Sequence, residues 1–203
     1  MNARQRRIGL FGGSFDPVHN GHVEAARTAI AFAALDDLYF LPAAASPFKV
    51  GLMQASHAQR LDMLRLATEG ESCFAVSDVE IVKSGVSYTI DTIRHFASVM
   101  PKAKLFFIIG ADSLMTLHQW KDAAELVRRC EIITLARPGW DAGRIEGFDV
   151  ETRDRLLRGI VRDFSCDVSS TEIRRRVAAG ECISEMVHPA VCTYIQKHGL
   201  YRS

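Results

Sequence analysis

Residues 8–22 read IGLFGGSFDPVHNGH, and residues 23–34 after them place apolar side chains at helical spacing. The apolar run at residues 8–11 has the length of a buried strand, and Gly12 and Gly13 follow it directly. Glycines after a strand let the backbone come close to a ligand, and the start of a helix offers free N–H groups to an anion. The stretch therefore predicts a strand, a phosphate-binding loop and a helix in succession.

Further apolar runs of strand length alternate with stretches of helical spacing, and these runs lie at residues 38–41, 74–76, 105–109 and 132–135. The run LFFII at 105–109 has no polar alternation, as expected of a strand that is covered on both faces. We predict an α/β fold, a doubly wound parallel sheet with helices on both faces. The chain has 203 residues, of which 48% are hydrophobic, so we expect one domain over 1–203 with a small helical part at about 169–203.

Three helix ends carry local signals. Capping boxes at Ser56 with Gln59 and at Ser169 with Glu172 predict that helices begin there. Residues 190–198 are predicted to form a last helix, because a proline precedes them and a glycine follows.

Composition limits the classes of partner. Lys and Arg number 25 against 24 Asp and Glu, so no overall positive field would hold a polyanion, and we expect no nucleic-acid partner. The longest apolar runs are far shorter than the roughly 20 residues of a membrane span, and no signal peptide follows the basic residues 1–7, so we predict a cytoplasmic protein without membrane association. The five cysteines form no C-x-x-C pair, which favours neither a zinc site nor a disulfide framework.

The loop after the first strand is neither the dinucleotide motif G-x-G-x-x-G nor a P-loop, since no G-K-[ST] ends it. His19 and His22 are three residues apart at a helix start, where two ring N–H donors could bind neighbouring phosphate oxygens. The alternatives are a zinc site or a pair of packed histidines, and no third metal ligand lies nearby in the sequence.

A second group of polar residues lies at 168–174, VSSTEIR. Ser170 and Arg174 are four residues apart and share a helix face, while Ile173 is placed to face the core. A hydroxyl, a guanidinium and a helix N-terminus then converge on one anion. The alternative is that Ser169 only caps the helix while the arginines form surface pairs, such as Arg176 with Glu172.

These two segments together resemble the H-x-G-H nucleotidyltransferases, and the further motifs in the chain are similar to those of bacterial nicotinate mononucleotide adenylyltransferases. The resemblance implies transfer of the adenylyl group of ATP to nicotinate mononucleotide, with release of pyrophosphate, and binding of Mg²⁺ together with ATP rather than by protein side chains. The acceptor phosphate is ionised near neutral pH, so no protein nucleophile is needed. We predict that the transition-state donors are His19, His22, Lys49, Ser170 and Arg174. The predicted ATP contacts are Gly12, Gly13, Ser14, Phe15, Gly110, Asp112, Ser169 and Thr171.

The resemblance also implies an acceptor side. Tyr88 and Thr89, in the segment SYTIDT, would contact the nicotinate carboxylate, Trp120 would stack on the pyridine ring, and Arg137 would meet the acceptor phosphate. A tryptophan that anchors the core is the alternative for Trp120. The chain departs from the family at residues 46–49, SPFK, where the lysine is kept and the usual histidine is replaced by Phe48.

Three other functions remain open at this point. The chain could adenylylate a different acceptor, such as nicotinamide mononucleotide or phosphopantetheine. It could be a non-catalytic ATP sensor, although binding alone would tolerate the loss of transition-state donors. RNA binding by analogy with the synthetases is disfavoured by the balanced charge.

Overall fold

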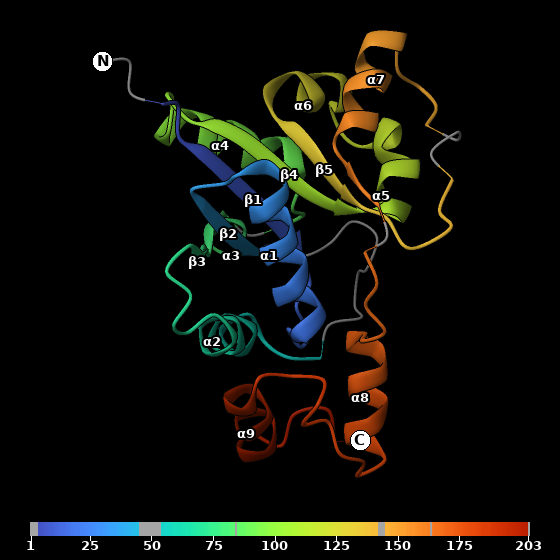
Figure 1. Ribbon diagram of the computed structural model, residues 1–203. Coiled ribbons are helices and arrows are strands. Elements are labelled where there is room, and N and C mark those ends of the chain that lie inside the picture. Colours follow the sequence, from blue (N-terminus) through green and yellow to red (C-terminus); the bar gives the residue numbers. More distant parts are fainter. Residues whose placement is uncertain (1–3, 45–53, 84, 142–144, 163, 203) are drawn as a thin grey trace.

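Six parallel strands form one sheet at the centre of the computed structural model, which describes residues 4–44, 54–83, 85–141, 145–162 and 164–202 (Figure 1). The strand order is β3-β2-β1-β4-β5-β6, and every neighbouring pair is parallel. The strands are β1 (Arg7–Gly13), β2 (Asp37–Pro42), β3 (Phe74–Val76), β4 (Lys104–Gly110), β5 (Glu131–Leu135) and β6 (Ile160–Val161). The five predicted strands are confirmed within one or two residues at each end, and the two-residue β6 was not predicted.

Helices cover both faces of this sheet, as predicted. The first face carries α1 (Asn20–Ala33) and α2 (His57–Ala67), and α8 (Ser170–Ala178) and α9 (Pro189–Lys197) add side chains to the same core from beyond the end of the sheet. The second face carries α4 (Thr89–Val99), α5 (Ala111–Thr116), α6 (Ala123–Arg129) and α7 (Val150–Arg158). The short helices α3 (Val79–Lys83) and η1 (Leu117–Gln119) complete the helices of the described chain.

Alternate side chains of the central strands enter separate cores on the two faces. On β4, Phe106 and Ile108 belong to the core under α1, whereas Phe107 and Ile109 belong to the core under α4. This division follows from the period of two along a strand, and it explains why residues 105–109 are apolar without interruption.

Helix ends match the sequence signals closely. Ser56 accepts a hydrogen bond from the Gln59 N–H at 3.3 Å, and the Gln59 side chain accepts one from the Ser56 N–H at 2.8 Å. The last helix ends at Lys197, and Gly199 follows it with a φ of 60°. The first helix begins at Asn20, three residues before the predicted start, with His19 as its N-cap.

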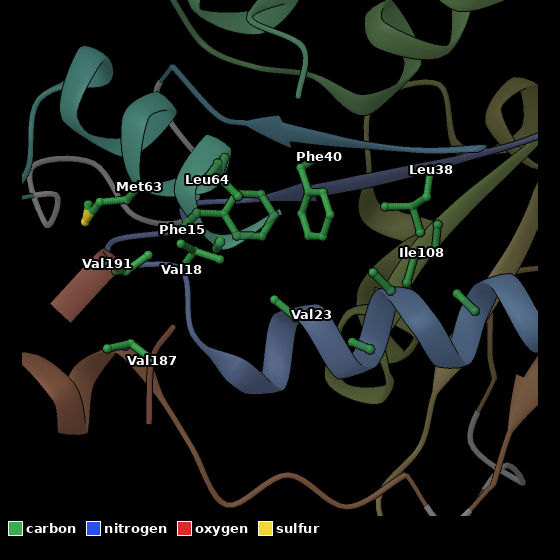
Figure 2. Close-up of a cluster of buried hydrophobic side chains, with 14 of the residues drawn as sticks. Phe15, Val18, Val23, Leu38, Phe40, Met63, Leu64, Ile108, Val187 and Val191 are labelled. Atoms are coloured by element: carbon green, nitrogen blue, oxygen red, sulfur yellow. The ribbon is translucent and has the colours of Figure 1, made fainter. Parts of the chain in front are cut away.

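Side chains of α2 and of the C-terminal helices share a core with the loop after β1. Figure 2 shows Phe15 and Val18 of this loop beside Met63 and Leu64 of α2, with Val191 of α9 close by. Figure 1 shows α8 and α9 (orange to red) at one end of the molecule, with α9 beside α2. The C-terminal helices therefore share a core with the loop that the sequence marks as a phosphate site.

Among the described residues, no helix is both long and apolar enough to cross a membrane.

Candidate active site

The strand order places a topological switch point between β1 and β4, the two central strands. The chain leaves β1 toward α1 on one face and leaves β4 toward α5 on the other. Parallel α/β sheets bind ligands in the crevice that opens at the carboxyl ends of such a pair of strands. The carboxyl ends are Gly13 and Gly110, both of which are predicted ATP contacts.

The two histidines of the loop stack on each other, with ring centroids 3.7 Å apart and an angle of 29° between the rings. The His22 Nδ1 atom accepts a hydrogen bond from the His19 backbone N–H at 3.2 Å. An accepting Nδ1 carries no proton, so the neutral His22 ring carries its proton on Nε2. The helix start therefore fixes His22 in the tautomer that presents Nε2 as a donor.

His19 is buried, with 7% of its surface exposed, and its Nδ1 has no hydrogen-bond partner within the described part of the chain. Burial lowers the pKa of His19 from its ordinary 6.5 to about 4. The ring is therefore neutral at neutral pH, and it can donate one hydrogen bond to an anion without carrying a charge of its own.

This shift in pKa predicts an acid-dependent loss of stability. The pKa of His19 is lower in the folded state than in the unfolded state, so the unfolded chain binds the extra proton as pH falls from 6.5 toward 4. Between pH 7.5 and pH 5 the wild-type free energy of unfolding should fall by about 2 kcal/mol more than that of His19→Gln, which cannot titrate. Urea unfolding at both pH values measures this difference, and parallel losses in the two proteins would contradict it.

Side chains of the protein itself pack closely against the glycines of the loop. A side chain on Gly21 would place its Cβ 2.0 Å from the Cys166 Sγ atom, and one on Gly13 would lie 2.8 Å from the Phe15 ring. A Cβ on Gly12 would lie 3.2 Å from the Phe107 ring. Gly110 differs, because nothing lies within 4 Å of the position where its Cβ would be. The space at Gly110 is open, and the ATP contact that the resemblance implies there stays a prediction.

The groups that Phe15 and Ser14 can offer a ligand are their backbone atoms and the Ser14 hydroxyl, because the Phe15 side chain is buried. The Phe15 side chain is 1% exposed and packs edge-on against His22, with ring centroids 4.9 Å apart. The carbonyl of Ser14 accepts a hydrogen bond from Arg60 at 2.7 Å. An ATP contact by Phe15 would therefore have to come from its main chain.

The second predicted motif reaches the same loop. The Ser170 hydroxyl donates to the Pro17 carbonyl at 2.9 Å, and the Arg174 Nη1 atom donates to the Asp16 carbonyl at 2.7 Å. Thr171 accepts a hydrogen bond from the Nη2 atom of Arg174 at 3.3 Å. The structure thus brings together two motifs that lie more than 150 residues apart.

The alternative for the second motif, in which Ser169 caps the helix and arginines form surface pairs, is correct for Ser169, Arg175 and Arg176. Ser169 caps α8 by accepting from the Glu172 N–H at 3.2 Å. The Arg175 and Arg176 side chains form ion pairs with Glu172 and Glu181 on the surface. Ser170 and Arg174 share a face of this helix, as their spacing predicted, and both donate hydrogen bonds to the loop.

The acceptor-side segments also lie near each other. The Ser87 hydroxyl accepts from the Ala44 N–H at 3.1 Å, which ties the start of α4 to the end of β2. Tyr88 is the N-cap of α4 and Thr89 its first residue. The Lys121 ammonium lies 4.5 Å from the centroid of the Tyr88 ring, so the segment after Trp120 contacts the start of α4.

Trp120 is half-buried and packs edge-on against Phe107, with ring centroids 6.3 Å apart. Its Nε1 atom is buried without a partner among the residues described. Arg137 is exposed just after β5, and Asp112 is exposed in the first turn of α5. Lys49 lies outside the described residues. The ligand contacts of all these side chains stay predictions.

Three residues that sequence reasoning missed surround the loop, namely Asp16, Arg60 and Tyr201. Asp16 belongs to the quoted motif but was given no role, and Arg60 carries no local signal. Tyr201 ends the segment 194–201, which is similar to the family's C-terminal segment, but it too was given no role. All three are buried in the structure. In the described ranges, no group of three or more His, Cys, Asp or Glu side chains is placed to hold a metal ion.

Comparisons with known proteins show the family and the fold. The model of the cytidylyltransferase-like family matches residues 10–176. A Neisseria meningitidis serogroup B protein named as a nicotinate-nucleotide adenylyltransferase is 42% identical, over 97% of this chain and 98% of its own length. A Clostridium tetani protein of the same name is 36% identical, over 97% and 100%. A solved structure of Plasmodium falciparum nicotinic acid mononucleotide adenylyltransferase, complexed with NaAD, covers 97% of each chain with a TM-score of 0.76 and 19% identity.

Proposed function

We propose that this chain, which belongs to the nicotinate-nucleotide adenylyltransferases within the cytidylyltransferase-like family, transfers the adenylyl group of ATP to nicotinate mononucleotide. The products are nicotinate adenine dinucleotide and pyrophosphate, as in NAD biosynthesis. The observation that carries the proposal is the meeting of the two motifs, since Ser170 and Arg174 of α8 contact the loop that holds the stacked His19 and His22.

The reaction needs positioning and charge stabilisation more than covalent chemistry. An oxygen of the acceptor phosphate attacks the α-phosphorus of ATP, and the bond from this phosphorus to the bridging oxygen of the β-phosphate breaks. Negative charge grows on the α-phosphoryl oxygens and on the departing pyrophosphate. Preorganised donors lower this barrier when they are aimed at the oxygens that gain charge.

The described residues supply such donors at the carboxyl end of β1. His22 presents an N–H at Nε2, and the neutral His19 supplies a second ring N–H. Arg174 brings a charged guanidinium with five N–H donors, of which the contacts to Asp16 and Thr171 use only part. We assign His19, His22 and Arg174 to the triphosphate, with Ser170 beside them and Lys49 as a further predicted donor.

Mg²⁺ fits this site as a companion of the nucleotide. The donor set of imidazoles, a hydroxyl and a guanidinium does not resemble the oxygen ligands that Mg²⁺ prefers, whereas phosphate oxygens and water do. A bound Mg²⁺ would neutralise part of the charge on the triphosphate, and the protein would hold the metal through ATP.

On the acceptor side we propose that Tyr88, Thr89 and Trp120 hold the pyridine ring and its carboxylate, with Arg137 at the phosphate. The contact between Lys121 and Tyr88 supports a shared pocket, because it joins the two segments that the family resemblance places there. An aromatic wall suits a pyridine nucleotide better than phosphopantetheine, which has no ring to stack.

A comparison of acceptors tests this function. Purified protein with Mg-ATP is given nicotinate mononucleotide, nicotinamide mononucleotide or phosphopantetheine, and kcat/KM is obtained from pyrophosphate release. We expect the highest kcat/KM with the nicotinate compound. A preference for another acceptor would contradict the proposed pocket, and ATP binding without pyrophosphate release from any acceptor would favour the sensor function.

A further inference from the structure

The Asp16 carboxylate connects three separate parts of the chain at the phosphate loop. Asp16 is 2% exposed, and its Oδ2 atom accepts from the Gln54 N–H at 2.8 Å. Its Oδ1 atom accepts from the Ala55 N–H at 3.1 Å and from the Tyr201 hydroxyl at 2.7 Å. A buried carboxylate is tolerated only when its oxygens are satisfied in this way. Its position in the fold is therefore set by these three donors.

Arg60 holds the same loop from the side of α2. Its side chain is fully buried, with Nη1 donating to the Ser14 carbonyl and Nη2 to the Ala43 carbonyl, each at 2.7 Å. These bonds join the residue after β1 to the residue after β2. Burial lowers the pKa of Arg60, and the neighbouring Asp16 carboxylate opposes that shift. The loop is thus held at Asp16 by the donors to its carboxylate and at Ser14 by the Arg60 guanidinium.

The loop needs such support because its backbone is strained. Phe15 has a φ of 48°, in the left-handed region that a bulky residue rarely adopts. A strained residue persists only when the surrounding structure over-determines its conformation, and this occurs most often at functional sites. Phe15 lies between Ser14, which Arg60 binds, and Asp16, which Tyr201 binds. The two bonds therefore enclose the strained residue.

Tyr201 comes from the far end of the chain, after α9, and is 7% exposed. Burial and the neighbouring Asp16 carboxylate raise the pKa of its hydroxyl, so the group stays protonated and donates. Residues 16 and 201 are 185 positions apart in the chain, so local helix or strand spacing does not predict their hydrogen bond. It fixes the loop to the C-terminal part, from which Ser170 and Arg174 also reach it.

We propose that Tyr201 and Arg60 are positioning residues for adenylyl transfer, which act through Asp16 and Ser14 to hold His19 and His22 in the productive geometry. Neither side chain is placed among the groups that touch ATP. The inference rests on the proposed function only in taking the loop as the ATP site. In this proposal, Tyr201 from the C-terminal part of the chain aligns the ring N–H donors of His19 and His22 at the start of α1.

The test is Tyr201→Phe, with Tyr194→Phe as its matched control. The Tyr194 hydroxyl donates to the Asp62 carboxylate at 3.1 Å, so the control removes a tyrosine–aspartate hydrogen bond from the same C-terminal part without touching the loop. We expect kcat of Tyr201→Phe to fall about 10-fold and its ATP affinity to fall at least about 3-fold, at a temperature where both variants are fully folded. Tyr194→Phe should stay within about 2-fold of wild type in both measurements.

A purely structural role gives a different result. In that case Tyr201→Phe would have a lowered melting temperature while kcat and ATP affinity match those of Tyr194→Phe, and this would overturn the proposal. Calorimetric ATP affinity needs no acceptor, so the proposal is still tested if the wild-type protein forms no dinucleotide. Failure of the wild-type protein to form a dinucleotide would overturn the proposed function but not the positioning role of Tyr201.

The Asp16→Ala background provides a second measurement. Alanine leaves no acceptor for the Tyr201 hydroxyl, so if Tyr201 acts through Asp16, adding Tyr201→Phe to Asp16→Ala should change ATP affinity less than about 2-fold further, because coupled residues give non-additive effects. Full additivity of the two losses would show that Tyr201 acts by another route and would contradict the proposal.

Discussion

Replacing His22 by alanine is expected to lower kcat by about 10²-fold or more while the fold is kept. The loss corresponds to about 2.7 kcal/mol or more of transition-state stabilisation, the usual effect of removing one preorganised donor from an anion site. The half-buried ring lies at the surface of the loop, so its removal leaves the strands and their core intact. Steady-state kinetics at saturating ATP and acceptor, with circular dichroism as a check of folding, measure the effect.

Two further variants separate the two nitrogen atoms of His22. His22→Asn can keep an acceptor near the Nδ1 position for the His19 N–H, but it has no donor at the Nε2 position. His22→Gln can place an amide N–H near the Nε2 position, but it leaves no acceptor near the Nδ1 position for the His19 N–H. We expect the asparagine variant to be as impaired as alanine, and the glutamine variant to recover part of the activity. Recovery with asparagine instead would mean that His22 serves as a helix cap and not as a phosphate donor.

Replacing Arg174 by alanine is expected to lower kcat/KM for ATP by about 10²-fold or more. The change removes a charge-assisted donor from the triphosphate, and it also breaks the hydrogen bond to the Asp16 carbonyl that ties α8 to the loop. Lysine at this position would keep the charge but lose the planar fork, so Arg174→Lys should recover only a small part of the activity.

The neighbouring arginine provides the control. Arg175 has its guanidinium in ion pairs with Glu172 and Glu181 on the surface, so Arg175→Ala should leave kcat/KM within about 3-fold of wild type. Equal losses in the two alanine variants would contradict the assignment, because they would trace the defect to the stability of α8 and not to the site.

The sheet could be predicted from sequence because its strands carry an unambiguous signal. Residues 105–109 are apolar throughout, and β4 is indeed covered on both faces, with Phe106 and Phe107 in different cores. The two-residue β6 has no such pattern, since Ile160 and Val161 stand between Gly159 and Arg162 and are too short an apolar run to indicate a strand. A pairing this short is decided by its neighbour β5 and not by its own sequence.

The candidate site was predicted in part. Spacing alone indicated that His19 with His22, and Ser170 with Arg174, share a face, and local helix geometry produces both arrangements. The resemblance implies an ATP contact at Phe15, whose side chain lies in the core, so a contact through its main chain stays a prediction. The glycines there make room for this ring as much as for a ligand, and a loop has no periodicity from which that could be read.

The links that hold the loop were not predictable. Tyr201 is 185 residues from Asp16 in the chain, and Arg60 appears in the sequence as one more charged residue on a helix. Such contacts depend on how α2 and the segment after α9 pack against the sheet, and a single sequence carries no record of this packing.

The most direct test of the account follows the phosphates of ATP. Protein is incubated with Mg²⁺ and nicotinate mononucleotide, and with ATP labelled in separate reactions at the α- or the γ-phosphate. Direct attack at the α-phosphorus predicts that the α label appears in the dinucleotide and the γ label in pyrophosphate, one for one. Release of the γ label as orthophosphate, or of the α label as free AMP without any dinucleotide, would contradict adenylyl transfer to a phosphate acceptor.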